Sequence, residues 1–100
     1  MTDSTHKIME QILGIPCGRV SCYRDIALKA GFPNGARQVV RVLHSMSRKH
    51  DLPWHRVIRC DGSIALEGEG RELQTELLRS EGIEVSAAGR VDMRRYTHQF

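Results

Sequence analysis

SCYRDIALKAGFPNGARQVVRVLHSM, the stretch from Ser21 to Met46, holds two helix-forming segments separated by a run that no regular helix crosses. In the first segment, apolar side chains recur at the i, i+3, i+4 and i+7 spacing of one helix face. They are Tyr23, Ile26, Ala27 and Ala30. Ser21 is suited to cap this helix, and the glycines and proline of residues 31–35 end it.

The second segment carries an apolar stripe at helical spacing, with Asn34 placed to cap it. The stripe consists of Ala36, Val39, Val40, Leu43 and Met46. A basic row follows its flank and consists of Arg37, Arg41, His44 and Arg48. Two helices joined by a glycine-containing turn, the second strongly basic, predict a helix-turn-helix. The alternative is an ordinary amphipathic helix whose arginines are only solvated.

A further helix is predicted ahead of this stretch, with Ser4 or Thr5 as its cap and Gly14 as its end. Beyond it, two apolar runs at 57–60 and 63–66 flank an Asp-Gly pair, which is a favoured two-residue turn. These runs predict a β-hairpin, which would be the wing of a winged helix.

A last helix is predicted from about Arg71 to Ser80. The fold class is therefore mainly α, a winged-helix-like helix-turn-helix domain with a small β-hairpin. Residues 1–84 form this domain. Residues 85–100 show no clear period, and we expect a tail that is either loosely ordered or docked.

Charge is strongly segregated along the 100 residues, although the net charge is only +3. Seven cations and one acid lie between Ile26 and Cys60, whereas six acids and two arginines lie between Glu67 and Glu84. A basic stretch of this kind is typical of nucleic-acid binding, but many solvated faces look similar. No signal peptide or membrane span is visible, so we expect a cytoplasmic monomer with no membrane partner.

The three cysteines, Cys17, Cys22 and Cys60, show no C-x-x-C spacing and no clustered histidine. This pattern suggests neither a disulfide framework nor a zinc site, so we expect reduced, structural thiols. The glycines match no nucleotide-binding fingerprint. Neither a metal nor a cofactor is expected.

The segment Leu-Pro-Trp-His-Arg-Val-Ile at 52–58 has a tryptophan as its third residue. It resembles the Pro-Cys-His-Arg-Val active-site run of the DNA alkyltransferases that remove alkyl groups from the O6 atom of guanine, with the cysteine replaced by Trp54. Such a thiolate attacks the alkyl carbon with help from the neighbouring histidine. An indole offers an N–H donor and no usable nucleophile.

Three more segments resemble the same family in the same order. They are Ile-Pro-Cys-Gly-Arg-Val-Ser-Cys-Tyr-Arg-Asp-Ile-Ala at 15–27, Ala-Arg-Gln-Val-Val at 36–40 and Leu-Leu-Arg-Ser-Glu-Gly at 77–82. Together with the Trp54 motif they span most of the chain. The chain is thus similar to the alkyltransferase-like proteins, the non-catalytic relatives of these enzymes, and to the C-terminal domain of the enzymes in fold.

The resemblance implies specific roles for individual residues. Arg37 would enter the duplex and fill the gap left by a flipped base, and Tyr23 would crowd the 3′ phosphate. The implied DNA contacts are Ser21, Tyr23, Arg37, Gln38 and Arg41. The implied lesion pocket consists of Tyr23, Trp54, His55 and Val57, with a backbone carbonyl of Val57 offered to the base. His55 and Glu81 would form a structural pair.

The implied function is recognition of O6-alkylguanine in double-stranded DNA by minor-groove binding and nucleotide flipping, without catalysis. The bound site would be marked for nucleotide excision repair proteins, and the protein would be associated with the nucleoid. One alternative is a winged-helix transcription regulator that binds undamaged DNA. A second is an active alkyltransferase that uses another cysteine. Cys17 is a poor candidate because Gly18 occupies the position of the essential histidine.

One departure from the family concerns the pocket lid. Where the enzymes have Tyr-Ser, alignment through the predicted hairpin places Glu67 and Gly68. Lid contacts are therefore not carried over from the family.

Overall fold

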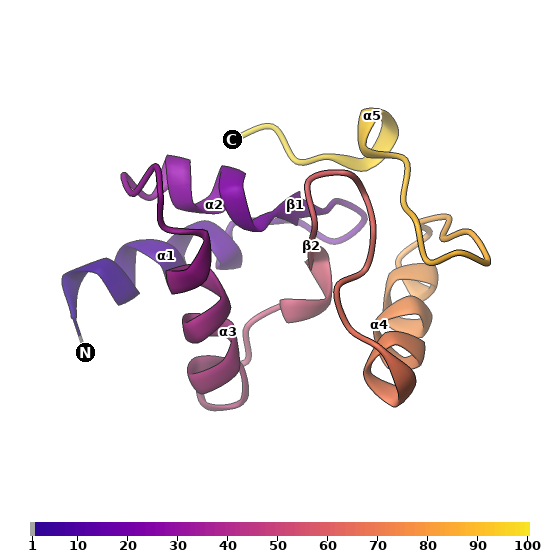
Figure 1. The fold of residues 1–100 in the computed structure, drawn as a ribbon, viewed down its shortest axis with the longest axis horizontal. Coiled ribbons are helices and arrows are strands. Elements are labelled where there is room, and N and C mark those ends of the chain that lie inside the picture. Colours follow the sequence, from indigo (N-terminus) through magenta and orange to yellow (C-terminus); the bar gives the residue numbers. More distant parts are fainter. Residues whose placement is uncertain (1) are drawn as a thin grey trace.

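The computed structural model describes residues 2–100, which form a mainly helical domain of 38 × 26 × 21 Å (Figure 1). Its elements are α1 (Asp3–Leu13), β1 (Ser21–Cys22), α2 (Tyr23–Lys29), α3 (Ala36–His50), the 3-10 helix η1 (Trp54–Arg56), β2 (Val57–Ile58), α4 (Gly68–Ser80) and α5 (Met93–Tyr96). The predicted mainly α class is confirmed. Within residues 2–100, no helix is both long and apolar enough to cross a bilayer.

Helices α1, α2 and α3 pack together around a first hydrophobic cluster. Its buried members are Ile8, Met9, Ile12, Ile15, Ile26, Ala27, Ala30, Val39, Val42, Leu52 and Val57. Most of these residues lie on the apolar faces of the three helices, and Ile15, Leu52 and Val57 come from the segments between the helices. Burial of one apolar face per helix therefore drives much of the packing. The helix-turn-helix pair α2 and α3 is thereby fixed against α1.

The helix starts differ from the predicted caps. Thr2, rather than Ser4 or Thr5, accepts a hydrogen bond from the Thr5 amide at 3.2 Å. Helix α2 begins after Cys22 without a side-chain cap, and α3 begins after Gly35 rather than Asn34. A Cβ at Gly35 would lie 2.8 Å from the Phe32 Cβ atom, so the tight turn before α3 requires a glycine there.

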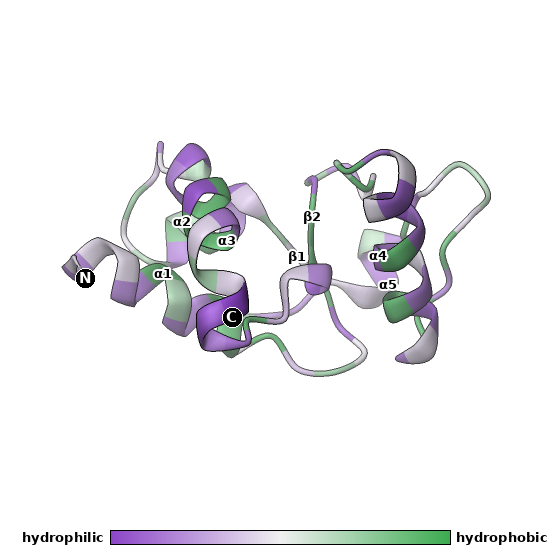
Figure 2. Cartoon of the chain, turned by 90° about the horizontal axis from the view of Figure 1, so that it is seen from below, coloured by the Kyte–Doolittle hydropathy of each residue, from purple (hydrophilic) through white to green (hydrophobic). Residues whose placement is uncertain are grey.

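A second hydrophobic cluster lies on the other side of the strands, between α4 and the C-terminal segment, residues 85–100 (Figure 2). Its buried members are Val20, Ile58, Ile64, Leu78, Ile83, Val85, Val91 and Tyr96. The C-terminal segment contributes three of these side chains and pairs with the chain near β1. The Val20 amide donates to the Tyr96 carbonyl at 2.9 Å, and the His98 amide donates to the Val20 carbonyl at 2.7 Å.

The predicted β-hairpin is wrong in its pairing. The turn at 61–62 forms, with Gly62 at φ +91° and the Arg59 amide bonded to the Ser63 carbonyl at 3.0 Å. Beyond Ser63, however, the chain pairs with the C-terminal segment through an isolated bridge to Arg90. The regular pair is instead parallel: β1 lies beside β2, with Ser21 opposite Val57. The run that begins at Val57 therefore pairs with β1, which is distant in sequence, and not with residues 63–66.

The expectation of three reduced thiols is also wrong. Cys22 and Cys60 form a disulfide across a sequence separation of 38 residues, with Cα atoms 5.0 Å apart. The β1–β2 pairing brings these residues together, because Cys22 lies opposite Ile58 and Cys60 follows two residues later. Cys17 remains free and exposed.

Candidate nucleic-acid interface and base pocket

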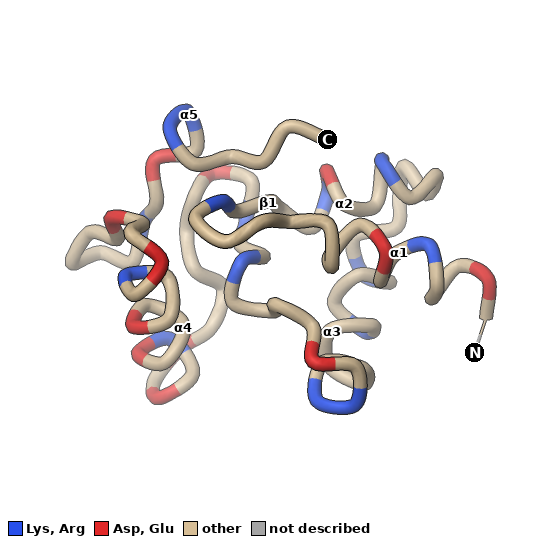
Figure 3. Tube along the Cα trace, turned by 180° about the vertical axis from the view of Figure 1, so that it is seen from behind, with Lys and Arg blue, Asp and Glu red and all other residues tan. Residues whose placement is uncertain are grey.

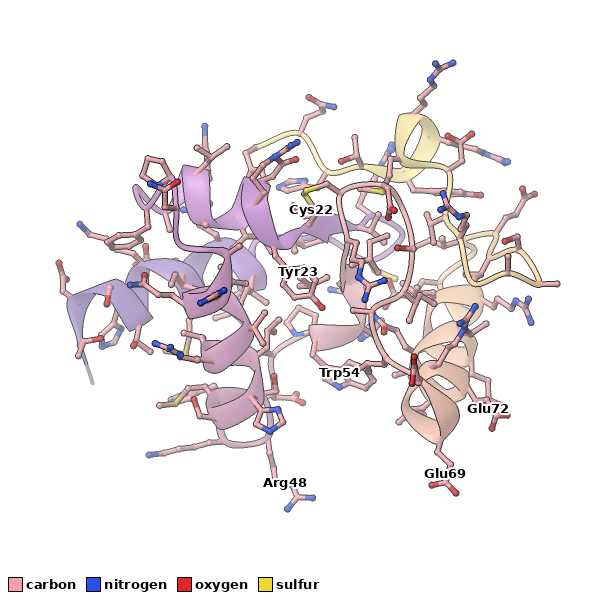
Figure 4. The ribbon with its side chains drawn as sticks, viewed as in Figure 1. Cys22, Tyr23, Arg48, Trp54, Glu69 and Glu72 are labelled. Carbon is pink, nitrogen blue, oxygen red and sulfur yellow. A yellow bond between two sulfur atoms is a disulfide. The ribbon has the colours of Figure 1, made fainter. Side chains whose placement is uncertain are left out.

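A cavity of about 310 Å³ opens between α3 and α4, beside the first hydrophobic cluster. Its lining residues are Tyr23, Val40, Leu43, His44, Ser47, Trp54, Val57, Leu66 and Gln74. The lining is mostly apolar with a few polar groups, and the volume is at the small end of the range of ligand pockets. Figure 4 shows Tyr23 and Trp54 on the side of the molecule where α3 and α4 face each other.

Trp54 begins η1 and is half-buried, so that its indole forms one wall of the cavity. Val57 forms part of another wall, and its carbonyl accepts a hydrogen bond from the Gln74 side-chain amide at 3.1 Å. The same Gln74 nitrogen donates to the His55 carbonyl at 3.0 Å. Gln74 is only 2% exposed. It therefore fixes the backbone on both sides of Arg56 against α4.

His55 was predicted as a pocket residue, but it does not line this cavity. Its ring lies edge-on to Trp54, with centroids 6.2 Å apart, and its Nε2 atom is 2.6 Å from Glu81 Oε2. The predicted pairing of His55 with Glu81 is present. The turn of η1 directs the indole toward the cavity and the imidazole toward the end of α4.

Glu81 is the centre of a largely buried polar network. Arg56 donates to both of its carboxylate oxygens, through Nε at 3.0 and 3.1 Å and Nη2 at 2.9 Å. The Gly18 amide donates to Oε1 at 3.0 Å. Burial raises the pKa of Glu81, but hydrogen bonds from Arg56, Gly18 and His55 outweigh it and lower the pKa to about 2. Arg56 also donates to the Ile15 carbonyl at 2.9 Å, so it braces the loop.

Tyr23 stands at the first turn of α2 and is half-buried against the first cluster. Burial raises its pKa, and the nearby positive charge of Arg59 opposes this shift. The ring lines the cavity beside Trp54 and Val57. Three of the four predicted pocket residues therefore share one cavity.

The outer face of α3 carries the predicted DNA contacts Arg37, Gln38 and Arg41, all exposed. Among residues 2–100, no ion pair engages Arg37, Arg41 or Arg48. Acidic residues concentrate instead on α4 (Figure 3). In Figure 4, Arg48 and the acids Glu69 and Glu72 lie on opposite sides of Trp54. A polyanion would therefore meet α3 in preference to α4.

Ser21 does not fit its predicted role as a DNA contact. It lies in β1 opposite Val57, its side chain is 1% exposed, and its hydroxyl has no hydrogen-bond partner within residues 2–100. Packing between the two strands keeps this hydroxyl away from the surface. We correct the prediction accordingly.

Several lining residues were missed from the sequence. Val40 was assigned to the core stripe of α3, yet it is 49% exposed and lines the cavity. His44 and Ser47 follow it at i+4 and i+7, so a row of this kind is a signal that the sequence contains. Leu66 and Gln74 carry no such signal, because only the placement of α4 brings them to the cavity.

One group of side chains has the composition of a metal site. Potential ligand atoms of Cys22, Asp25 and Cys60 lie within 4.8 Å of one another. The two sulfurs are bonded to each other, however, and a metal requires thiolates. In this oxidised state the group is a crosslink.

A basic helix beside an apolar cavity defines a DNA-binding domain with room for an extruded base. Residues 3–83 match the family described as 6-O-methylguanine DNA methyltransferase, DNA binding domain. The chain belongs to this family.

Its relatives include proteins named for base flipping and for likeness to alkyltransferases. The chain is 42% identical to a DNA base-flipping protein of Vibrio parahaemolyticus, with 93% of each sequence covered. It is 40% identical to the DNA base-flipping protein of Escherichia coli, with 90% of this chain and 70% of that protein covered. It is 36% identical to alkyltransferase-like protein 1 of Schizosaccharomyces pombe, with 79% and 75% covered.

Solved structures show the same architecture. S. pombe Atl1, in complex with damaged DNA containing O6-carboxymethylguanine, superposes with a TM-score of 0.86 at 30% identity. That match covers 100% of this chain and 98% of Atl1. Mycobacterium tuberculosis OGT in complex with DNA gives a TM-score of 0.66 at 30% identity, over 82% of this chain and 50% of OGT.

Proposed function

We propose that this protein binds O6-alkylguanine in double-stranded DNA, flips the nucleotide into the cavity beside Trp54, and does not remove the alkyl group. Helix α3 lies in the minor groove in this proposal, as the family resemblance implies. The complex then marks the site for nucleotide excision repair. The names of the relatives and the damaged DNA bound by Atl1 support the proposal.

The observation that carries the proposal is the position of the three sulfurs relative to the cavity. Alkyl transfer to cysteine requires a thiolate next to the alkyl carbon. Trp54 walls the cavity from the motif position of the nucleophile. Cys17 is exposed and is not part of the lining, and Cys22 and Cys60 are bonded to each other. A base in the cavity would therefore meet an indole and no free thiol.

The energetics of flipping fit these residues. Extruding a base costs a few kcal/mol and costs least at a damaged pair. Stacking on an aromatic side chain returns about 1–3 kcal/mol and tolerates different substituents, which suits Trp54 and a range of alkyl groups. Arg37, exposed at the start of α3, has a planar guanidinium that can stack and hydrogen-bond in the vacated space.

We propose the acidic face of α4 as the surface that binds the repair partner, because its negative charge repels the phosphates of DNA. Glu72 and Glu76, together with Arg71 and Arg79, line a second, polar depression of about 610 Å³ between α4 and residues 86–89. The exposed acids of the face are Glu67, Glu69, Glu72 and Glu76. Bound DNA on α3 would leave this face open to a basic partner surface.

The proposal is tested with two duplexes that differ only in a single guanine or O6-methylguanine. We expect tighter binding to the methylated duplex, and mass spectrometry of the recovered protein should show no added methyl group. Stoichiometric methylation of the protein would identify an active alkyltransferase. Equal affinity for both duplexes, together with preference for a defined undamaged sequence, would identify a transcription regulator.

Arg37→Gln should weaken binding to the methylated duplex about tenfold while changing binding to the unmodified duplex much less. The reason is that Arg37 fills the gap in the duplex only when a base has left the stack. Arg48→Gln is the matched control, since it removes the same charge from the far end of α3. Arg48→Gln should weaken binding to both duplexes equally. Fluorescence anisotropy measures the dissociation constant of each variant for each duplex. If Arg37→Gln weakens binding to both duplexes equally, Arg37 is only a phosphate contact.

A further inference from the structure

Arg59 is a cation two residues beyond the cavity-lining Val57, and neither the fold nor the proposed pocket uses its side chain. It directly follows β2 and is exposed. Its backbone is engaged, since its amide donates to the Ser63 carbonyl at 3.0 Å and its carbonyl accepts from the Gly62 amide at 2.9 Å. Its guanidinium makes no ion pair or hydrogen bond with residues 2–100. An exposed guanidinium on a fixed backbone is ready for an external anion.

The strand pairing brings the chain at Arg59 close to the chain at Tyr23. Ser21 lies opposite Val57 and Cys22 lies opposite Ile58, and Tyr23 and Arg59 are the residues that directly follow these two strands. Tyr23 begins α2 there and lines the cavity, as does Val57, two residues before Arg59.

Two further observations agree with this placement. The positive charge of Arg59 opposes the rise in the pKa of Tyr23 that burial causes. The Cys22–Cys60 disulfide joins the residue before Tyr23 to the residue after Arg59. The two side chains are therefore held on crosslinked backbones, which reduces the entropy lost on binding.

Two acids could compete for Arg59. Asp25 lies beside the sulfur of Cys60 and is engaged by Arg24 at 3.4 Å, and Asp61 is two residues along the chain. The Asp61 carboxylate already accepts from the Ser63 amide at 2.9 Å and the Ser63 hydroxyl at 2.6 Å, and it lies 3.8 Å from Arg90. Hydrogen bonds from Ser63 are the main reason that its pKa is lowered, and Arg59 contributes least. The Asp61 carboxylate is thus engaged by Ser63, and the Arg59 guanidinium is left to bind an external anion.

We infer that Arg59 and Tyr23 form a phosphate clamp at the mouth of the cavity, which grips the backbone phosphate next to the flipped nucleotide. Tyrosine donates one hydroxyl hydrogen bond, and arginine donates two parallel N–H bonds to phosphate oxygens. The clamp rests on the proposed flipping function and adds to it a residue that positions the nucleotide. A phosphate held there would be beside the base that enters between Tyr23 and Trp54.

The test uses O6-methylguanine duplexes in which phosphates flanking the lesion are replaced one at a time by neutral methylphosphonate. Arg59→Gln should weaken binding to the all-phosphate duplex about tenfold and reduce the slope of log K against log salt by about 0.9. At one flanking phosphate, the substitution and the methylphosphonate should not be additive. Arg59→Lys should recover part of the affinity, because it restores the charge without the bidentate geometry.

Arg90→Gln is the matched control, because Arg90 is an exposed arginine at the same turn that is paired with Asp61. It should change neither affinity nor additivity, and circular dichroism should confirm that each variant is folded. Additive effects at every flanking phosphate would overturn the clamp and leave Arg59 as a general cation. If the wild-type protein fails to prefer the methylated duplex at all, the flipping function fails instead, so the two failures are distinct.

Discussion

Glu81→Gln is expected to lower the free energy of unfolding by about 3 kcal/mol at neutral pH. The Glu81 side chain is 10% exposed and Arg56 is 18% exposed, so solvent screens this pair little. A shift in pKa from 4.5 to about 2 corresponds to about 3 kcal/mol of preference for the ionised carboxylate in the folded state. Removing that charge leaves Arg56 buried without its partner.

The same shift fixes the direction of the pH dependence. Because the folded-state pKa of Glu81 is lowered, its contribution is present above about pH 4.5 and is lost as the pH falls toward 2. Urea unfolding followed by circular dichroism at pH 7 and pH 3 measures the difference. The wild-type protein should lose stability between these values more than Glu81→Gln does.

Glu76→Gln is the control for this prediction, since Glu76 is an exposed acid on the same helix. It should leave stability nearly unchanged. If Glu81→Gln behaves like Glu76→Gln at both pH values, the network does not stabilise the fold. The effect on lesion binding should be indirect, because the network anchors η1, which carries Trp54.

Reduction of the Cys22–Cys60 disulfide is expected to destabilise the protein by about 4 kcal/mol, from the chain entropy of a closed loop of this length. The loop of 38 residues contains α2 and α3, so the reduced unfolded chain gains freedom across the whole helix-turn-helix. The melting temperature of a 100-residue domain should then fall by more than about 10 °C.

The measurement is thermal unfolding with and without a strong thiol reductant. The double substitution Cys22→Ala with Cys60→Ala should melt like the reduced wild-type protein and should be insensitive to reductant. Cys17→Ala is the control and should retain the full response. Titration of the denatured, unreduced wild-type protein should find one thiol. Three thiols, with no effect of reductant, would contradict the crosslink.

Features that depend on neighbouring residues were predicted from the sequence, whereas features that depend on contacts between distant segments were not. The apolar faces of α2 and α3 follow from local periodicity and were predicted, except that Val40 is exposed and Val42 is buried in its place. The chain after the turn pairs with a segment that is distant in sequence: Ser63 pairs with Arg90, and the Ile64 amide donates to the Gly89 carbonyl. The disulfide was missed for the same reason, since its spacing follows no motif.

The candidate site divides in a similar way. Tyr23, Trp54 and Val57 share the cavity, and each lies in a motif that resembles the family. Gln74 and Leu66 lie in no such motif, and their place depends on how α4 packs. The roles in DNA binding remain predictions for Arg37, Gln38 and Arg41.

The cavity has walls from α3 on one side and from α4 on the other. A guest between these helices contacts both of them at once and acts as a brace between them. Its affinity therefore adds to the resistance of the whole domain to melting. Heating the protein with each candidate nucleotide lesion would then rank the guests by the rise in midpoint, without any label on the DNA.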